Sequence, residues 1–255
     1  MIETFGVPFP HGATRKKRKV YVYLPDERQP GEKFPVLYMF DGHNVFFDTD
    51  ATYGKSWGML EYLSASGLPL IVAAADCNHS PNHGRLREYS PFSFDDPRIG
   101  HITGKGRATM EWMVHDFKDT IDAAYPTLPG RDTTFIAGSS MGGLMTLYAL
   151  ACYGDVYSRG AALSPSVWTR PDRVLRLIRE SETLPRSVLY MDYGERELEG
   201  HEGMRRFLME TAGALYDKHV SLSFRIVPGG EHCEACWEQQ IPFFMSVLTY
   251  PGFQT

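Results

Sequence analysis

Apolar runs and helix-like patterns alternate along most of the chain, and this alternation restricts the fold more than any other feature. The runs at 34–40 and 68–76 are continuously apolar, as strands buried on both faces are. A helical pattern at 55–66 lies between them, and the alternation continues to residue 250. Further strands are predicted at 133–138, 159–165, 187–194 and 221–227, and further helices at 109–125, 141–154, 170–182, 201–219 and 234–250. We therefore expect an α/β fold with a mostly parallel central sheet and helices on both faces.

Length and linker composition bear on how the chain is divided. Its 255 residues suffice for one large α/β domain or two small ones, but no linker separates two halves. We therefore predict a single domain over residues 1–255. Segment 77–108 is too long for an ordinary connection, and such loops are usually functional. We expect it on the active-site side. The alternating pattern at 15–25 begins with basic residues and predicts an edge strand guarded by charge.

Charge and cysteine content disfavour several functional classes. The net charge of −5 argues against a nucleic acid or an anionic membrane as partner. The first thirty residues contain no apolar segment of signal-peptide length, and no run approaches the ~18 residues of a membrane span. We therefore expect a cytoplasmic protein. The 4 cysteines are too few and too scattered for a disulfide framework.

The segment 138–142 reads Gly-Ser-Ser-Met-Gly and lies between a predicted strand and a predicted helix. This is the G-x-S-x-G pattern of a nucleophile elbow, in which a sharp, strained turn raises the central side chain above the sheet. The central residue is Ser140, so Ser140 is the candidate nucleophile, and Ser139 is expected to cap or pack. The backbone N–H of Met141 is then a candidate oxyanion-hole donor. A glycine-rich helix start or an anion-binding turn is the competing interpretation.

A serine nucleophile needs a histidine base and a carboxylate that orients it, and in this chain order both follow the serine. Of the three histidines beyond residue 140, His201 and His219 fall within a predicted amphipathic helix. His232 lies between the last strand and the last helix, where the base is expected. The acid should follow the preceding strand, and position alone leaves four candidates open: Asp192, Glu195, Glu197 and Glu199.

Several motifs together resemble the enterochelin-esterase-like branch of the α/β hydrolases, the putative esterase family. The family also contains S-formylglutathione hydrolases, feruloyl and acetyl-xylan esterases, and mycolyltransferases. The resemblance covers nearly the whole chain and implies an α/β-hydrolase fold. It is carried by VLYMFDGHNVFFD (36–48), RLREYSP (85–91), FIAGSSMGGL (135–144), LSPSVW (163–168), YMDYGERE (190–197) and GGEHCEACW (229–237).

The resemblance also implies roles for particular residues. Members carry G-x-x-[DE] after the penultimate strand, and the last position, here Glu197, is the triad acid, with Asp192 as the next candidate. Glutamate replaces the aspartate of many members, which changes the hydrogen-bond geometry. The loop after the first core strand is implied to give the second oxyanion-hole donor, from the backbone of His43 or Asn44.

Candidate substrate contacts are Trp168, Arg85 and Tyr89, although an ion pair between Arg85 and Glu88 that braces the long loop is the competing interpretation. Basic residues outnumber acidic ones in 77–108, which favours a polar or anionic substrate. No metal and no organic cofactor is implied, because Cys233-x-x-Cys236 lacks a second ligand pair.

We predict a serine esterase that hydrolyses a small soluble ester through an acyl-enzyme, without nucleic acid or membrane as partner. An acyltransferase uses the same triad with an alcohol as acceptor, and a non-catalytic binding module on a hydrolase fold is the alternative of another class. A homo-oligomer is left open. A further alternative is a metal-dependent hydrolase, with ligands drawn from Asp41, His43, Asp76, His79 and His83. His79-x-x-x-His83 would have to lie on a helix, and Pro81 and Gly84 disfavour a helix there.

Overall fold

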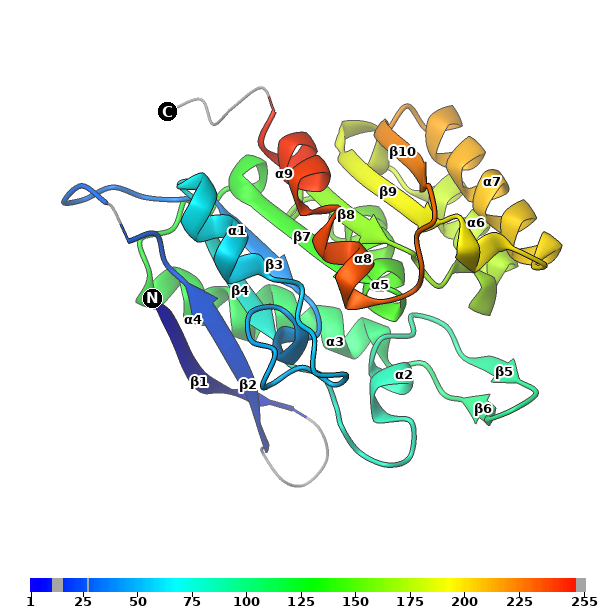
Figure 1. Cartoon of the computed structure of the whole chain (residues 1–255), viewed down its shortest axis with the longest axis horizontal. Coiled ribbons are helices and arrows are strands. Elements are labelled where there is room, and N and C mark those ends of the chain that lie inside the picture. The colour runs from blue at the N-terminus through cyan, green and yellow to red at the C-terminus, as the bar shows by residue number, and fades with distance from the viewer. Residues whose placement is uncertain (11–15, 27, 251–255) are drawn as a thin grey trace.

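The computed structural model describes residues 1–10, 16–26 and 28–250. A sheet of eight strands crosses the molecule in the order β1-β2-β4-β3-β7-β8-β9-β10 (Figure 1). Its strands are β1 (Ile2–Phe9), β2 (Lys16–Tyr23), β3 (Val36–Met39), β4 (Ile71–Ala75), β7 (Thr134–Ser139), β8 (Arg159–Leu163), β9 (Val188–Gly194) and β10 (Ser221–Val227). The strands from β4 to β10 pair in parallel, whereas β2 is antiparallel to both β1 and β4. The predicted α/β fold with a mostly parallel sheet is confirmed.

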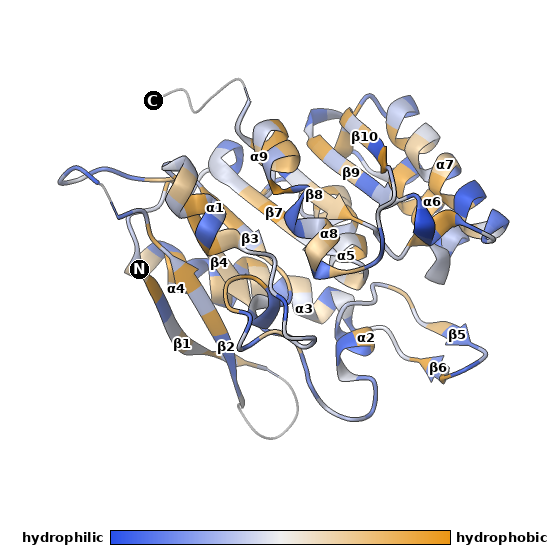
Figure 2. Ribbon diagram, viewed as in Figure 1, coloured by the Kyte–Doolittle hydropathy of each residue, from blue (hydrophilic) through white to orange (hydrophobic). Residues whose placement is uncertain are grey.

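Helices cover both faces of the sheet, which explains the continuously apolar strands. Along β3, Val36 and Tyr38 belong to one buried cluster, and Leu37 and Met39 belong to the other, because successive side chains of a strand point to opposite faces. The first cluster is covered by α3 (Gly106–Trp112), α4 (Lys118–Ala124), α5 (Met141–Cys152), α6 (Pro171–Glu180) and α7 (Glu202–Asp217). The second is covered by α1 (Met59–Ser66), α8 (Glu234–Glu238) and α9 (Ile241–Thr249). Apolar residues accordingly concentrate in the strands and on the helix sides that face them (Figure 2).

Three elements differ from the sequence prediction. The strand predicted at the edge corresponds to β2, which lies between β1 and β4, whereas the edge strand is β1, which was not predicted. Residue 15, where the predicted strand begins, is outside the described residues. The helix predicted at 109–125 contains a π-helical turn, Met113–Phe117, between α3 and α4. The helix predicted at 234–250 is two helices, and α9 starts afresh with Pro242 in its first turn. Proline lacks the N–H that a continuous helix would require there.

Segment 77–108 is more ordered than a simple loop. It contains the short helix α2 (Gly84–Glu88) and a small hairpin of β5 (Phe94–Asp96) and β6 (Gly100–Ile102). Backbone hydrogen bonds join its C-terminal end to its middle: Lys105 N–H donates to Arg87 O at 2.7 Å, and Gly106 N–H donates to Ser90 O at 2.8 Å. The segment therefore packs as a structured insertion between β4 and α3.

Within the described residues, no helix combines the length and the apolar character needed to cross a membrane.

Candidate active site

Ser140 occupies a strained turn between β7 and α5. Its backbone has φ 57° and ψ −120°, a conformation that is costly for a residue with a side chain. Two backbone hydrogen bonds hold it there: Ser140 N–H donates to Leu163 O at 2.9 Å, and Ser166 N–H donates to Ser140 O at 3.0 Å. A Cβ at Gly138 would lie 2.7 Å from the backbone carbon of Gly142, so the turn requires glycine there. This is the geometry of a nucleophile elbow.

The two neighbouring serines of the motif differ in environment. Ser139 ends β7 and is buried, whereas the side chain of Ser140 is partly exposed. Ser140 Oγ lies 3.4 Å from Ser166 Oγ. Ser140 and His232 line the same cavity, but no hydrogen bond joins them in the part of the chain that the structure describes. Such bonds are often long without substrate and tighten when it binds.

His232 and Glu197 meet from two loops at the carboxyl ends of β9 and β10. His232 Nδ1 lies 2.6 Å from Glu197 Oε2, and Glu197 belongs to a 3-10 turn, Arg196–Leu198, that follows β9. Glu197 Oε1 also accepts hydrogen bonds from Ser164 Oγ at 2.6 Å and Gly194 N–H at 2.9 Å. Burial of this carboxyl opposes its ionisation, but the bonds from His232 and Ser164 hold its pKa below the usual value. A buried anion therefore supports the imidazole.

The other three candidate acids have different contacts. Asp192 is 1% exposed and accepts hydrogen bonds from Tyr190 Oη at 2.8 Å and from Ser164 N–H at 3.3 Å. Burial raises the pKa of Asp192 to about 7. Glu195 accepts the N–H of Gly229 at 2.9 Å, and Glu199 is exposed. Among the four, within the described residues, only Glu197 contacts His232.

Trp237 packs against the triad candidates from α8. Its ring is perpendicular to the ring of His232, with centroids 5.0 Å apart, and its Nε1–H donates to Ser164 Oγ at 3.2 Å. Ser164 itself has a left-handed backbone, φ 44°, and donates to Glu197. Ser164 and Trp237 therefore fix the positions of the carboxylate and the imidazole, and Ser164 was not singled out from the sequence.

The loop after β3 approaches the elbow from the other side. Met141 N–H lies at the first turn of α5, where backbone N–H groups have no partner within the helix. Across from it, a 3-10 turn spans Gly42–Asn44, and Asn44 N–H is already bonded to Asp41 O at 2.7 Å. Of the two residues expected to give the second oxyanion-hole donor, Asn44 therefore has its backbone N–H engaged within the turn, which favours His43.

Arg85 braces this loop through Asp41. Arg85 Nε and Nη2 donate to the two oxygens of Asp41 at 2.6 and 2.7 Å, and Asp41 N–H donates to Tyr89 Oη at 3.1 Å. Asp41 has a left-handed backbone, φ 56°. The expected pair of Arg85 with Glu88 is wrong, because Glu88 instead pairs with Arg18 at 2.7 Å. Both ion pairs nevertheless attach α2 to the body of the protein.

Only one of the three candidate substrate contacts lines the cavity that contains Ser140, and it is Arg85. Tyr89 is 1% exposed and its hydroxyl bonds to the Asp41 backbone, so burial keeps it from the cavity. Trp168 is 37% exposed but packs edge-on against Phe94, with ring centroids 6.4 Å apart. In the structure, Tyr89 and Trp168 therefore contact segment 77–108 and its surroundings rather than line this cavity.

The cavity is also lined by three polar side chains that were not expected from the sequence, those of Glu234, Thr52 and Tyr53. Glu234, at the start of α8, is 6% exposed and accepts a hydrogen bond from Asn44 Nδ2 at 3.2 Å. Thr52 N–H donates to Asn44 Oδ1 at 2.9 Å. Burial raises the pKa of Glu234. Its proximity to His232 in the sequence is a signal that could have identified Glu234, whereas Thr52 carries none.

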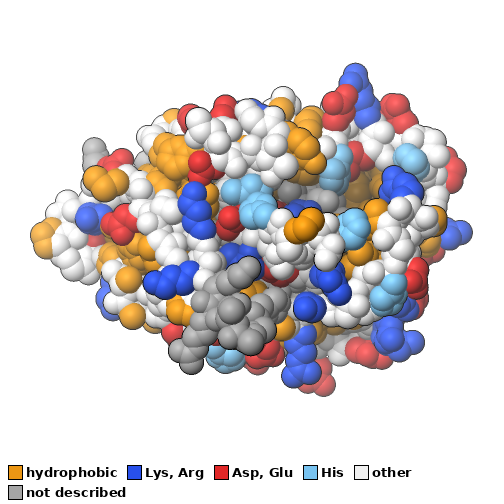
Figure 3. Space-filling view, turned by 90° about the horizontal axis from the view of Figure 1, so that it is seen from below, with side chains coloured by type: hydrophobic (Ala, Val, Ile, Leu, Met, Phe, Trp, Pro, Cys, Tyr) orange, Lys and Arg blue, Asp and Glu red, His pale blue; other side chains and the backbone are white. Residues whose placement is uncertain are grey.

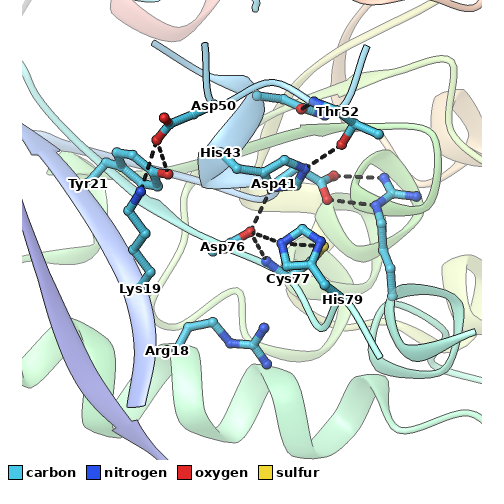
Figure 4. Close-up of polar contacts among 12 residues, drawn as sticks. Arg18, Lys19, Tyr21, Asp41, His43, Asp50, Thr52, Asp76, Cys77 and His79 are labelled. Carbon is cyan, nitrogen blue, oxygen red and sulfur yellow. Dashed lines mark hydrogen bonds and ion pairs between the residues drawn. The ribbon is translucent and has the colours of Figure 1, made fainter. Parts of the chain in front are cut away.

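The residues considered earlier as metal ligands separate into two sets. Three of them, His43, Asp76 and His79, lie close together, and Cys77 is a fourth member of this group (Figure 4). Asp41 instead pairs with Arg85, and His83, which directly precedes α2, does not belong to this group. On the face seen from below, histidine side chains gather near the middle, with basic and acidic side chains around them (Figure 3).

Comparison with known proteins identifies the family. The family described as Putative esterase matches residues 12–242. Among solved structures, the BES protein from Bacillus cereus has a TM-score of 0.73 at 16% identity, covering 98% of this chain and 95% of its own. The enterobactin esterase FES from Shigella flexneri has a TM-score of 0.74 at 17% identity, covering 98% of this chain but 59% of its own. S-formylglutathione hydrolase FrmB from Staphylococcus aureus has a TM-score of 0.66 at 17% identity, covering 97% of both chains. At these identities the structures show a shared fold, and the family match shows that the chain belongs to the putative esterase family.

Proposed function

We propose that this protein is a serine esterase that hydrolyses a small, polar carboxylic ester through an acyl-enzyme. One observation carries the proposal: the strained Ser140 opens into the cavity that also contains His232, and His232 is supported from behind by the buried carboxylate of Glu197. Family membership supports the same class of reaction. The proposed roles are nucleophile for Ser140, general base and acid for His232, and orienting carboxylate for Glu197.

The proposed reaction has two halves. Ser140 Oγ attacks the ester carbonyl carbon while His232 Nε2 takes the hydroxyl proton, and the resulting imidazolium is stabilised by Glu197. The oxyanion is bound by the N–H groups of Met141 and His43. His232 then gives the proton to the leaving alcohol as the carbon–oxygen bond breaks. In the second half, water loses a proton to His232 and attacks the acyl carbon. His232 then returns the proton to Ser140 Oγ as the bond between Ser140 Oγ and the acyl carbon breaks and the acid leaves.

The cavity lining bears on the class of substrate. It contains polar side chains from Asn44, Thr52 and Glu234, which suit an ester with hydroxyl or amide groups. The guanidinium of Arg85 also lines it, but Asp41 already neutralises this charge. The surplus of basic residues in 77–108 therefore gives the cavity no free positive charge, and we propose a polar substrate without a requirement for negative charge.

Ester hydrolysis by the purified protein tests the proposal. The panel consists of p-nitrophenyl esters of rising chain length, methyl ferulate and a catecholate lactone. Ser140→Ala is expected to abolish hydrolysis, and Ser139→Ala, the matched control one residue earlier, to retain most of it. A fluorophosphonate probe should label wild type at Ser140 only. Activity that survives Ser140→Ala, or labelling at another residue, would contradict the assignment.

The same assay separates the alternatives. With an alcohol present, an acyltransferase would form a new ester in preference to the free acid, and product analysis by mass spectrometry distinguishes the two. A non-catalytic module would bind an ester without turnover and without reacting with the probe. Hydrolysis by wild type together with probe labelling excludes the non-catalytic module.

A further inference from the structure

Four potential metal ligands from two loops converge beside the candidate active site, and one of them, His43, belongs to the loop proposed to give an oxyanion-hole donor. They are His43, from the 3-10 turn after β3, and Asp76, Cys77 and His79, which directly follow β4. One ligand atom from each lies within 4.8 Å of every other. Because β3 and β4 are adjacent parallel strands, their carboxyl ends bring these two loops together (Figure 4).

One oxygen of Asp76 is the centre of this group. Asp76 Oδ1 lies 2.6 Å from His43 Nδ1 and 2.8 Å from His79 Nε2, and Cys77 Sγ lies 4.0 Å from the same His79 nitrogen. His43 Nδ1 is buried and, despite this short distance, has no hydrogen-bond partner. Its contact with Asp76 is therefore close but not aligned as a hydrogen bond, which leaves the Nδ1 lone pair or proton without a satisfied partner.

The charges around the group leave Asp76 without a permanent cation. Lys19 pairs with Asp50 at 2.9 Å, and Arg85 pairs with Asp41. Among the described residues, no lysine or arginine pairs with Asp76, although its side chain is only 14% exposed. A carboxylate shielded from water is costly unless a positive charge compensates it. The backbone N–H of Cys77 donates to Asp76 Oδ1 at 2.7 Å but carries no net charge, whereas a divalent cation would supply the compensating charge.

We propose that His43, Asp76, Cys77 and His79 bind a divalent transition-metal ion, with Zn²⁺ as the best match. Imidazole, thiolate and carboxylate are the ligands that zinc takes in tetrahedral sites. Zinc bonds of about 2.0–2.3 Å place ligand atoms roughly 3.3–3.8 Å apart. The distances from Asp76 Oδ1 to His43 and His79 would therefore lengthen on binding, whereas the 4.0 Å distance between Cys77 Sγ and His79 Nε2 would shorten. Thr52 Oγ1 lies 2.9 Å from His43 Nε2, which is the outer-shell partner that fixes a ligating imidazole.

The ion has a route to this site and a structural consequence. The group opens onto a hollow lined by Lys19, Tyr21 and Asp50, which gives entry from solvent. A bound ion would join the turn that contains His43 to the end of β4 without contacting Ser140 or His232. We therefore expect binding to stabilise the fold. The inference does not depend on the proposed esterase activity.

Metal binding by the full chain tests the inference. Zn²⁺ is titrated by calorimetry, and Co²⁺ is used as a spectroscopic probe, with a thiolate absorption band expected from Cys77. His79 is the best position to change, because its side chain is 57% exposed and outside the catalytic set. His79→Gln and Asp76→Asn are each expected to weaken Zn²⁺ binding by at least about 100-fold, since loss of even an outer-shell partner costs 10–100-fold. At a hundredfold excess over Kd, Zn²⁺ should raise the wild-type Tm by about 5–10 °C.

Two controls make the test specific. His101→Gln removes an exposed histidine that pairs with Asp95, at 2.8 Å, and should leave binding unchanged. Cys233→Ser/Cys236→Ser removes two neighbouring cysteines that lie outside the proposed site, and this variant should also bind Zn²⁺ normally. The inference is overturned if wild type does not bind Zn²⁺, if His79→Gln binds it equally well, or if only the double cysteine variant loses binding. Circular dichroism of each variant shows that it is folded.

Discussion

The contact between Glu197 and His232 gives the sharpest prediction about the proposed mechanism. Glu197→Gln preserves the size of the side chain, but its orientation is constrained. Glu197 Oε1 accepts the N–H of Gly194 at 2.9 Å, so the amide oxygen must take this position and the NH₂ group must face His232. That NH₂ donates to Nδ1 and forces the imidazole proton onto Nε2, where the base must be free to accept a proton. The variant therefore holds the wrong tautomer.

The expected loss of activity in Glu197→Gln has two contributions. A hydrogen bond to a charged group contributes about 1.5–3 kcal/mol, and the 2.6 Å contact with a carboxylate that is 6% exposed belongs to this class. This alone corresponds to roughly 10- to 150-fold in rate. The wrong tautomer adds to it, and the equivalent change in a serine protease costs about 10⁴ in kcat. We expect Glu197→Gln to lower kcat/KM by about 10³–10⁴.

Steady-state kinetics on the best p-nitrophenyl ester measures this loss. Asp192→Asn is the matched control, because Asp192 is buried nearby but bonds to Tyr190 rather than to His232. It should keep kcat/KM within about threefold of wild type. Thermal melts show whether each variant is folded. A loss below tenfold in Glu197→Gln, or a greater loss in Asp192→Asn, would refute the assigned role of Glu197.

Three further predictions concern the supports of the site. Gly138→Ala should destabilise the fold by several kcal/mol in urea denaturation, because the added Cβ would lie 2.7 Å from a backbone atom. Its control is Gly213→Ala on α7, where the added Cβ meets open space and should stabilise the fold by about 0.5–1 kcal/mol. Arg85→Met should lower the free energy of unfolding by about 2–4 kcal/mol, because it leaves Asp41 buried without its cation. Adding Asp41→Asn in the same chain should recover part of this loss in a double-mutant cycle, and additive effects of the two substitutions would contradict the coupling. The pKa of Asp192 in the folded state, about 7, lies above the ordinary value of about 3.9. Between these two pH values the folded state keeps a proton that the unfolded state has lost, so the stability of the fold should fall as the pH rises from about 4 to about 7. Asp192→Asn should reduce this fall in urea midpoints, and an unchanged pH dependence would show that Asp192 is not its cause.

The parts of the fold that sequence predicted well are those encoded in short windows. The two-sided burial of β3 and β4 requires continuous apolar runs, and these runs indicated both strands. β1 was missed because its residues alternate irregularly between exposed and buried, as an edge strand allows. The division of the last helix into α8 and α9 was also missed, since the apolar pattern continues through the break.

The sequence by itself determined the α/β architecture and the position of Ser140, because periodicity and a glycine-bounded turn are local properties of the chain. It could not by itself select among four acids, because each is within loop reach of His232. The tertiary structure brings Glu197 to His232 and buries Asp192 against Tyr190. It also decided that Arg85 pairs with Asp41, 44 positions away in the chain. Such contacts depend on which strand ends become neighbours and on where side chains point after packing, and neither is written in any short stretch of sequence.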